Sequence, residues 1–255
     1  MKQFKQILNT VISEQLSDEP VALLFSGGTD SLTILWTLLD LGIKPTCYTF
    51  HLSYFESTDA KVSKKACNHW GVNQVIVNED KRDIPSQLKD VISIIQSPRK
   101  THVEVMYAYY FLMQAVKEKH IFSGIQADSL YGSNKNAAIQ CGKQSAKFFA
   151  DYRRKLVANP DQEGYKQANL LASHFNKILY TPYSDNRIRE FYYQYSWKQL
   201  NSPKQKMPPI LSFEDRFKEM PIYRIDDNLQ CGSHIREHLA DYVKQYKRIY
   251  ENVNN

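Results

Sequence analysis

The chain has 255 residues, of which 42% are hydrophobic and 24% charged, and it carries a modest net charge of +6. This composition is ordinary for a globular protein, and the charge permits binding of nucleotides or nucleic acid without requiring either. Four widely spaced cysteines without a C-x-x-C pair argue against a disulfide framework and against a tetrathiolate metal site. No apolar segment approaches a membrane span and no signal peptide opens the chain, so we expect a cytoplasmic protein without a membrane partner.

Strand and helix patterns alternate through the first half of the chain. Apolar runs typical of strands lie at residues 21–25, 46–50, 75–77 and 121–123. Apolar residues at helical spacing occupy residues 4–12, 58–70, 84–95 and 103–119. This alternation predicts an α/β fold with a doubly wound parallel sheet, in which ligands lie beyond the carboxyl ends of the strands.

The strand signal fades beyond about Lys143, where helical runs and an aromatic cluster take over. We therefore expect an α/β core over residues 1–142 and a helical C-terminal part over residues 143–255, packed on the same domain. The densest basic stretch, residues 143–155, is explained most simply as a solvated helix face, with an RNA groove as the alternative.

The first predicted strand ends in a glycine turn that opens a helix, with the sequence Ser26-Gly27-Gly28-Thr29-Asp30-Ser31. Two glycines let the backbone turn tightly and bring N–H groups against an anion, and the helix N-terminus adds the positive end of its dipole. The serine hydroxyls are further donors, and Asp30 can hold a cation or cap the helix. The turn predicts a phosphate site that is neither a P-loop, since Gly-Lys-Ser/Thr is missing, nor a G-x-G-x-x-G dinucleotide loop.

This turn resembles the SGGxDS loop of the ATP pyrophosphatases, the adenine nucleotide alpha hydrolase-like (HUP) enzymes that split ATP into AMP and pyrophosphate. The resemblance implies that the loop binds the phosphates of ATP through Ser26, Gly27, Gly28, Thr29, Asp30 and Ser31. It also implies that the chain around Thr49 and Phe50, at the end of the second strand, binds the adenine base.

A second segment resembles the SGEGxDExxGG signature of the asparagine synthetase family. It reads Ile121-Phe122-Ser123-Gly124-Ile125-Gln126-Ala127-Asp128-Ser129-Leu130-Tyr131-Gly132. The resemblance implies that Gly124 lies at the nucleotide and that Asp128 is a catalytic, magnesium-binding carboxylate opposite Asp30. Two such carboxylates holding Mg²⁺ would neutralise the departing pyrophosphate. A helix N-cap is the alternative role for Asp128.

Two later segments extend the resemblance. Residues 180–191 resemble the PFxDxxLxEF segment of the family in their helical part. Pro203-Lys204-Gln205-Lys206-Met207 falls where the family carries an essential lysine in an R-Q-K context. The resemblance implies that Lys206 is the catalytic lysine, which would stabilise the adenylated intermediate or the tetrahedral adduct. Together the segments cover residues 21–207 in the right order and indicate a relative of the synthetase domain of asparagine synthetase.

The departures from the family pattern concern the acceptor. In the second signature the first acidic residue is replaced by Ile125, the second glycine by Gln126 and the last acidic residue by Ser129. The synthetase-like part begins almost at once, so we expect no glutamine-hydrolysing domain. Ammonia, a substrate amine or a separate amidotransferase would then supply the nitrogen. We expect a retained nucleotide half and an altered acceptor half, with a product other than asparagine.

These patterns predict an ATP- and Mg²⁺-dependent ligase-type enzyme. It would adenylate a small-molecule acceptor, a carboxylate, with release of pyrophosphate, and then form an amide or related C–N bond with ammonia or an amine. The alternative is an enzyme that uses the same loop to modify a nucleoside or nucleic-acid partner or to transfer sulfur.

The C-terminal region holds one further motif. Cys231-Gly232-Ser233-His234 resembles the cysteine motif of sulfonucleotide reductases, which share this fold. Cys231, His234 and His238 also have a zinc-like spacing, although helix packing explains the same pattern.

Overall fold

The computed structural model describes residues 1–52, 57–79, 83–159, 164–220, 233, 235–240, 242 and 244. One sheet contains the strands β1 (Val21–Leu24), β2 (Thr46–His51), β3 (Gln74–Asn78), β4 (His120–Phe122) and β5 (Ile178–Tyr180). All neighbouring strands are parallel, in the order β3-β2-β1-β4-β5. The prediction of a doubly wound parallel sheet is thus confirmed. The chain order reverses between β1 and β4, and such switch points are where these sheets bind ligands.

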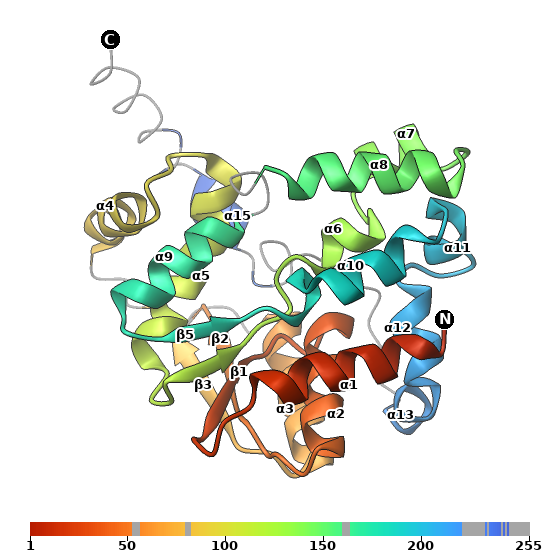
Figure 1. The fold of residues 1–255 in the computed structure, drawn as a ribbon. Coiled ribbons are helices and arrows are strands. Elements are labelled where there is room, and N and C mark those ends of the chain that lie inside the picture. The colour runs from red at the N-terminus through yellow and green to blue at the C-terminus, as the bar shows by residue number, and fades with distance from the viewer. Residues whose placement is uncertain are drawn as a thin grey trace.

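Helices cover both faces of the sheet (Figure 1). One face carries α1 (Gln3–Gln15), α2 (Thr29–Asp40) and α3 (Thr58–Trp70). The other face carries α4 (Ile84–Ile95), α5 (Lys100–Ala115) and α9 (Tyr165–His174). The side chains of β1 alternate between the two cores, with Val21 and Leu23 in the first and Ala22 and Leu24 in the second. Burial on both faces explains why this strand is a continuous apolar run.

The remaining helices follow β4 and β5. They are α6 (Ala127–Tyr131), α7 (Lys135–Cys141), α8 (Ala146–Val157), the 3-10 helix η2 (Pro182–Ser184), α10 (Asn186–Tyr193), α11 (Trp197–Asn201), α12 (Met207–Ser212), α13 (Glu214–Glu219) and α15 (Ile235–His238). In Figure 1, α6, α7, α8, α10 and α11 gather on the side away from α4 and α9. Within the described residues, no helix combines the length and apolar character needed to cross a bilayer.

Two elements differ from the sequence predictions. The strand β5 lies in a segment where no strand was expected. It gives no clear sequence pattern, because it is three residues long, forms the edge of the sheet and leaves Ile178 39% exposed. Helix α5 was expected to reach Lys119 but ends at Ala115. The backbone becomes extended at Val116, whose side chain is buried in the same core as Ile121 of β4.

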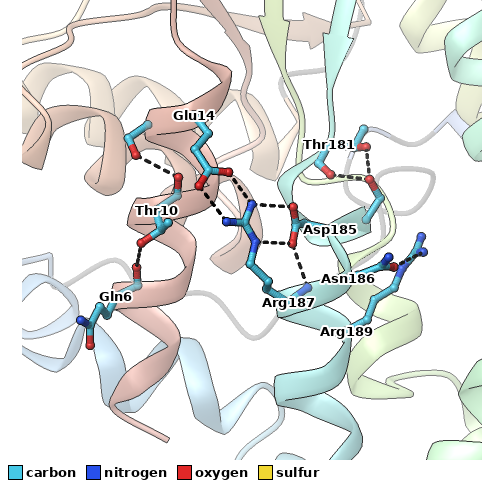
Figure 2. Close-up of polar contacts among 10 residues, drawn as sticks. Gln6, Thr10, Glu14, Thr181, Asp185, Asn186, Arg187 and Arg189 are labelled. Carbon is cyan, nitrogen blue, oxygen red and sulfur yellow. Dashed lines mark hydrogen bonds and ion pairs between the residues drawn. The ribbon is translucent and has the colours of Figure 1, made fainter.

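An ion-pair joint ties α10 to α1 (Figure 2). Arg187 donates to both oxygens of Glu14, at 2.9 and 2.6 Å, and to Asp185 Oδ2 at 2.9 Å. Asp185 also caps α10 by accepting the backbone N–H of Arg187 at 2.8 Å. The hydrogen bonds from Arg187 lower the pKa of both carboxyl groups. The ion pairs orient α10 relative to α1. Because Arg187 and Glu14 are exposed, these ion pairs add little to the free energy of unfolding.

Candidate active site

A pocket of about 610 Å³ opens where the loops after β1 and β4 meet. Nine of the eleven residues predicted to bind ATP or Mg²⁺ or to take part in catalysis line it: Ser26, Gly28, Asp30, Ser31, Thr49, Phe50, Gly124, Asp128 and Lys206. Gly27 and Thr29 belong to the same loop but are not among the lining residues. Tertiary structure therefore brings together residues from widely separated segments of the chain.

The loop after β1 is closed tightly around Gly27. This glycine has φ +75°, and a Cβ on it would lie 2.8 Å from Val62 Cγ1 and 2.9 Å from Ser63 N of α3. Ser26 Oγ accepts the N–H of Gly28 at 3.3 Å, and Ser31 Oγ donates to the Gly28 carbonyl at 3.1 Å. A preformed turn at the start of a 12-residue helix is suited to bind phosphate.

The chain at the end of β2 forms another wall of the pocket. Thr49 and Phe50 are both buried. The Thr49 hydroxyl donates to the Phe25 carbonyl at 2.7 Å and accepts from Gln74 Nε2 at 2.9 Å. Because the fold uses this hydroxyl, a base bound here would meet the backbone and the apolar side chains.

Lys206 lies between two carboxylates at the centre of the site. Its Nζ is 2.8 Å from Asp30 Oδ2 and 3.0 Å from Asp128 Oδ1, and its side chain is only 3% exposed. The three residues belong to different elements: Asp30 to α2, Asp128 to α6, and Lys206 to the position before α12. The side chain of Asp128 is 50% exposed. Its partial burial raises its pKa, but the Lys206 charge and the hydrogen bonds from Lys206 and Ser133 outweigh this effect, so the pKa lies below its usual value.

The two carboxylates also suit a magnesium ion. Mg²⁺ takes oxygen ligands and is commonly held by one or two carboxylates together with substrate phosphates. Asp30 Oδ2 and Asp128 Oδ1 already converge on one cationic atom, so these residues fit the ion. Within the described part of the chain, no group of three or more His, Cys, Asp or Glu residues forms a metal site. The N-cap of α6 is Gln126, so the alternative N-cap role of Asp128 is not what the structure shows.

Three side chains hold the C-terminal end of α6, the helix that carries Asp128. Arg153 Nη1 donates to the Leu130 carbonyl at 2.8 Å, and Asn201 Nδ2 donates to the Tyr131 carbonyl at 2.7 Å. Trp197 Nε1 completes the set with a 2.8 Å bond to the Gly132 carbonyl. Helix ends leave such carbonyls without intrahelical partners, so these bonds fix the position of α6.

Arg153 differs from its basic neighbours. It is fully buried, with its guanidinium 3.9 Å from the centre of the Phe149 ring, whereas Lys147, Arg154 and Lys155 are exposed. Burial lowers the pKa of Arg153 to about 10. The prediction of a solvated helix face therefore holds for Lys147, Arg154 and Lys155, but Arg153 is buried and hydrogen-bonds within the fold.

Ile125, Gln126 and Ser129, the residues at which the sequence departs from the family pattern, also line the pocket. Several other pocket residues were not indicated by the sequence. Further lining side chains come from α5, α7 and α8 and include Met106, Lys135, Tyr152 and Leu156. Their helical spacing is typical of ordinary packing, so no local signal distinguishes them.

The C-terminal cysteine motif falls mostly outside the described residues, because Cys231, Gly232 and His234 are not among them. His238 is described, and its Nε2 shares a hydrogen bond with Glu79 Oε1.

Comparisons with known proteins identify the family. The asparagine synthase family model matches residues 3–229. No curated protein matches the chain. Solved structures with some likeness include the predicted subunit of tRNA methyltransferase from Methanocaldococcus jannaschii, with 16% identity, TM-score 0.38 and coverage of 78% of this chain and 89% of that chain. Another is the U34-tRNA thiolase NcsA from Methanococcus maripaludis with its 4Fe-4S cluster, with 15% identity, TM-score 0.33 and coverage of 94% and 87%.

At these identities and TM-scores, the two structures do not indicate a function for this chain. The family match, in contrast, spans most of the chain and includes the Ser26–Ser31 loop, Asp128 and Lys206. The chain therefore belongs to the asparagine synthase family and is an ATP pyrophosphatase-type enzyme.

Proposed function

We propose that this protein activates a carboxylic acid with ATP and joins it to ammonia or an amine. The observation that carries the proposal is the position of Lys206 Nζ, 2.8 Å from Asp30 and 3.0 Å from Asp128 in the pocket that the Ser26–Ser31 loop lines. Charges held in place around a reacting phosphate stabilise the transition state without reorganisation. This arrangement supports chemistry at the α-phosphate of ATP.

In the first step an oxygen of the acceptor carboxylate attacks the α-phosphorus. The bond from that phosphorus to the oxygen bridging to the β-phosphate breaks, so pyrophosphate leaves and an acyl-adenylate forms. Ser26, Ser31 and the backbone of the loop would bind the phosphates. Asp30 and Asp128 would hold Mg²⁺, which supplies charge neutralisation at the leaving group.

In the second step the nitrogen lone pair of ammonia or an amine attacks the acyl carbonyl. The carbonyl carbon loses AMP, the nitrogen loses a proton, and an amide remains. The Lys206 ammonium would stabilise the negative oxygen of the tetrahedral adduct. The nitrogen donor would be free ammonia, an amine substrate or ammonia from a separate amidotransferase.

Detection of AMP and pyrophosphate tests this proposal. ATP is incubated with the protein, Mg²⁺ and pools of carboxylic acids with and without ammonia or amines. Release of both products with an acid pool supports the proposal, and Asp30→Ala and Asp128→Ala should abolish it. Release of ADP and phosphate instead, or full activity of Asp30→Ala, would show that the central assignment is wrong.

Modification of a nucleic acid is the second candidate function. Exposed lysines lie on or next to α7 and α8, and one of them, Lys135, lines the pocket. Phe148 on α8 is 48% exposed and could stack on a base. Salt-sensitive RNA binding, together with AMP release only when RNA is present, would favour this candidate over the first.

A further inference from the structure

Gln126 holds a strained backbone conformation at the wall of the pocket. Its φ is +76° and its ψ is −8°. Among the described residues, four that are not glycine have positive φ: Gln96, Gln126, Asn176 and Lys206. Gln126 and Lys206 are the two that line the pocket. A left-handed backbone is unfavourable for any residue with a Cβ. We therefore ask what the Gln126 side chain does in the pocket that offsets this cost.

The side chain of Gln126 is oriented by α10. Arg189 Nη2 donates to Gln126 Oε1 at 3.2 Å. Arg189 is held in turn by Asn186 Oδ1, 3.5 Å from its Nη1, as Figure 2 shows. Since the amide oxygen is engaged by Arg189, the Nε2 group is the part of Gln126 that can donate to a ligand.

The pocket that Gln126 lines has apolar side chains on part of its wall and polar ones, such as Arg99, His102 and Lys135, on the rest. Ile125 is half-buried next to it and packs against the core that contains α5. Tyr152 and Leu156 of α8 and Met106 of α5 line the same pocket. Gly124, two residues before Gln126, lies against Asp30, since a Cβ there would be 3.0 Å from Asp30 Cβ. The Gln126 loop therefore flanks the place where an acceptor would meet the α-phosphate.

We propose that Gln126 recognises the acceptor by donating from Nε2 to an oxygen of its carboxyl group. This inference rests on the proposed function and names its substrate class. The acceptor is a carboxylic acid with an aliphatic or aromatic body, which packs against Ile125 and Leu156. We expect no α-amino group on the part of the acceptor that contacts Ile125, because this side chain offers no charge or hydrogen-bond acceptor to an ammonium group.

A panel of acids tests the substrate class. AMP and pyrophosphate are measured with hexanoate and 3-phenylpropanoate, with their amino counterparts leucine and phenylalanine, and with aspartate, each with ammonia present. We expect release with the two apolar acids. Release with aspartate or only with amino acids overturns the inference and leaves the proposed function standing. No release with any carboxylic acid overturns both.

A matched pair of variants tests the residue. Gln126→Gly and Gln96→Gly both relieve a positive φ, and Gln96 is an exposed C-cap of α4 that does not line the pocket. We expect both to raise Tm by about 2 °C. Only Gln126→Gly should lower kcat/KM for the active acid, by about tenfold or more, with the KM for ATP unchanged.

Arg189→Met serves as a second variant that keeps the Gln126 backbone. It should lower the same kcat/KM without the rise in Tm that Gln126→Gly produces. Wild-type kcat/KM in Gln126→Gly, or a loss confined to the KM for ATP, would refute the role of Gln126.

Discussion

The two loops that meet at the switch point each contain one residue with the same unusual backbone angle. It is Gly27 in the loop after β1, with φ +75°, and Gln126 in the loop after β4, with φ +76°. At Gly27 the glycine is required twice, by the backbone angle and by α3, which leaves no space for a Cβ. At Gln126 the same angle carries a long polar side chain that reaches the pocket wall.

The two loops therefore differ in how tightly they pack against the rest of the fold. In the loop after β1, Gly27 packs against α3, so a larger residue at this position would disturb the fold. The loop after β4 opens to the pocket at Ile125 and Gln126, so its side chains can differ from the family pattern while Gly124 and Asp128 stay in place.

Lys206→Met should produce the largest effect, because Lys206 contacts a carboxylate in the first turn of the helix that follows each loop. We expect AMP formation to fall by about 10²–10³-fold, as for loss of one preorganised charge-stabilising donor. Steady-state release of AMP and pyrophosphate provides the measurement. Lys198→Met removes an exposed lysine on α11 and should behave as wild type. If Lys206→Met retained more than half of the activity, the Lys206 ammonium group between Asp30 and Asp128 would not be needed for AMP formation.

Arg153→Met tests the support of the second loop. The change removes the donor to the buried Leu130 carbonyl and the donor to the partly buried Tyr195 carbonyl. We expect a loss of about 2–4 kcal/mol in the free energy of unfolding, measured in urea. Arg154→Met, at the exposed neighbouring position, should change it by about 0.5 kcal/mol or less. Equal losses in the two variants would show that Arg153 stabilises the fold no more than its exposed neighbour does.

Gly27→Ala tests the requirement in the first loop. It combines a left-handed backbone with a 2.8 Å contact to Val62, so we expect about 2–3 kcal/mol of destabilisation. Gly42→Ala is the matched control, since Gly42 has φ +79° and a Cβ there would meet nothing within 4 Å. It should lose only about 1 kcal/mol, from the backbone alone. A similar loss in both variants would mean that α3 does not restrict the loop.

The lowered pKa of Asp128 predicts a modest pH effect. A carboxyl group with a folded pKa below its unfolded value of about 3.9 stabilises the fold above that value. The contribution disappears as the pH falls through the folded pKa. Asp128→Asn should therefore flatten the loss of stability between about pH 5 and pH 2. Urea unfolding across this interval measures the effect.

Glu14→Gln should have the smallest effect, because the joint to Arg187 is exposed and lies outside both loops. We expect a Tm within about 1 °C of wild type and unchanged AMP formation. Thermal melts at low and high salt provide the measurement. A large fall in Tm that vanishes in salt would show that the joint stabilises α10 more than its exposure suggests.

Much of the fold could be predicted from local sequence. The strands β1 to β4 are short apolar runs, and Ser57 and Gly71 mark the ends of α3 as a capping serine and a left-handed glycine. The edge strand β5 was missed because three residues, one of them partly exposed, do not make a strand pattern. Its place is decided by pairing with β4, a contact between segments far apart in the sequence.

For the site, the sequence by itself determined the glycine loop and, through the family resemblance, named Asp30, Asp128 and Lys206. Only the tertiary structure decided that the lysine lies between the two carboxylates, because that contact joins α2, α6 and the residue before α12. It also decided that Arg153 is buried and that Gln126 is aimed by Arg189. Such contacts depend on carbonyls and side chains far along the chain, and no local pattern of residues encodes them.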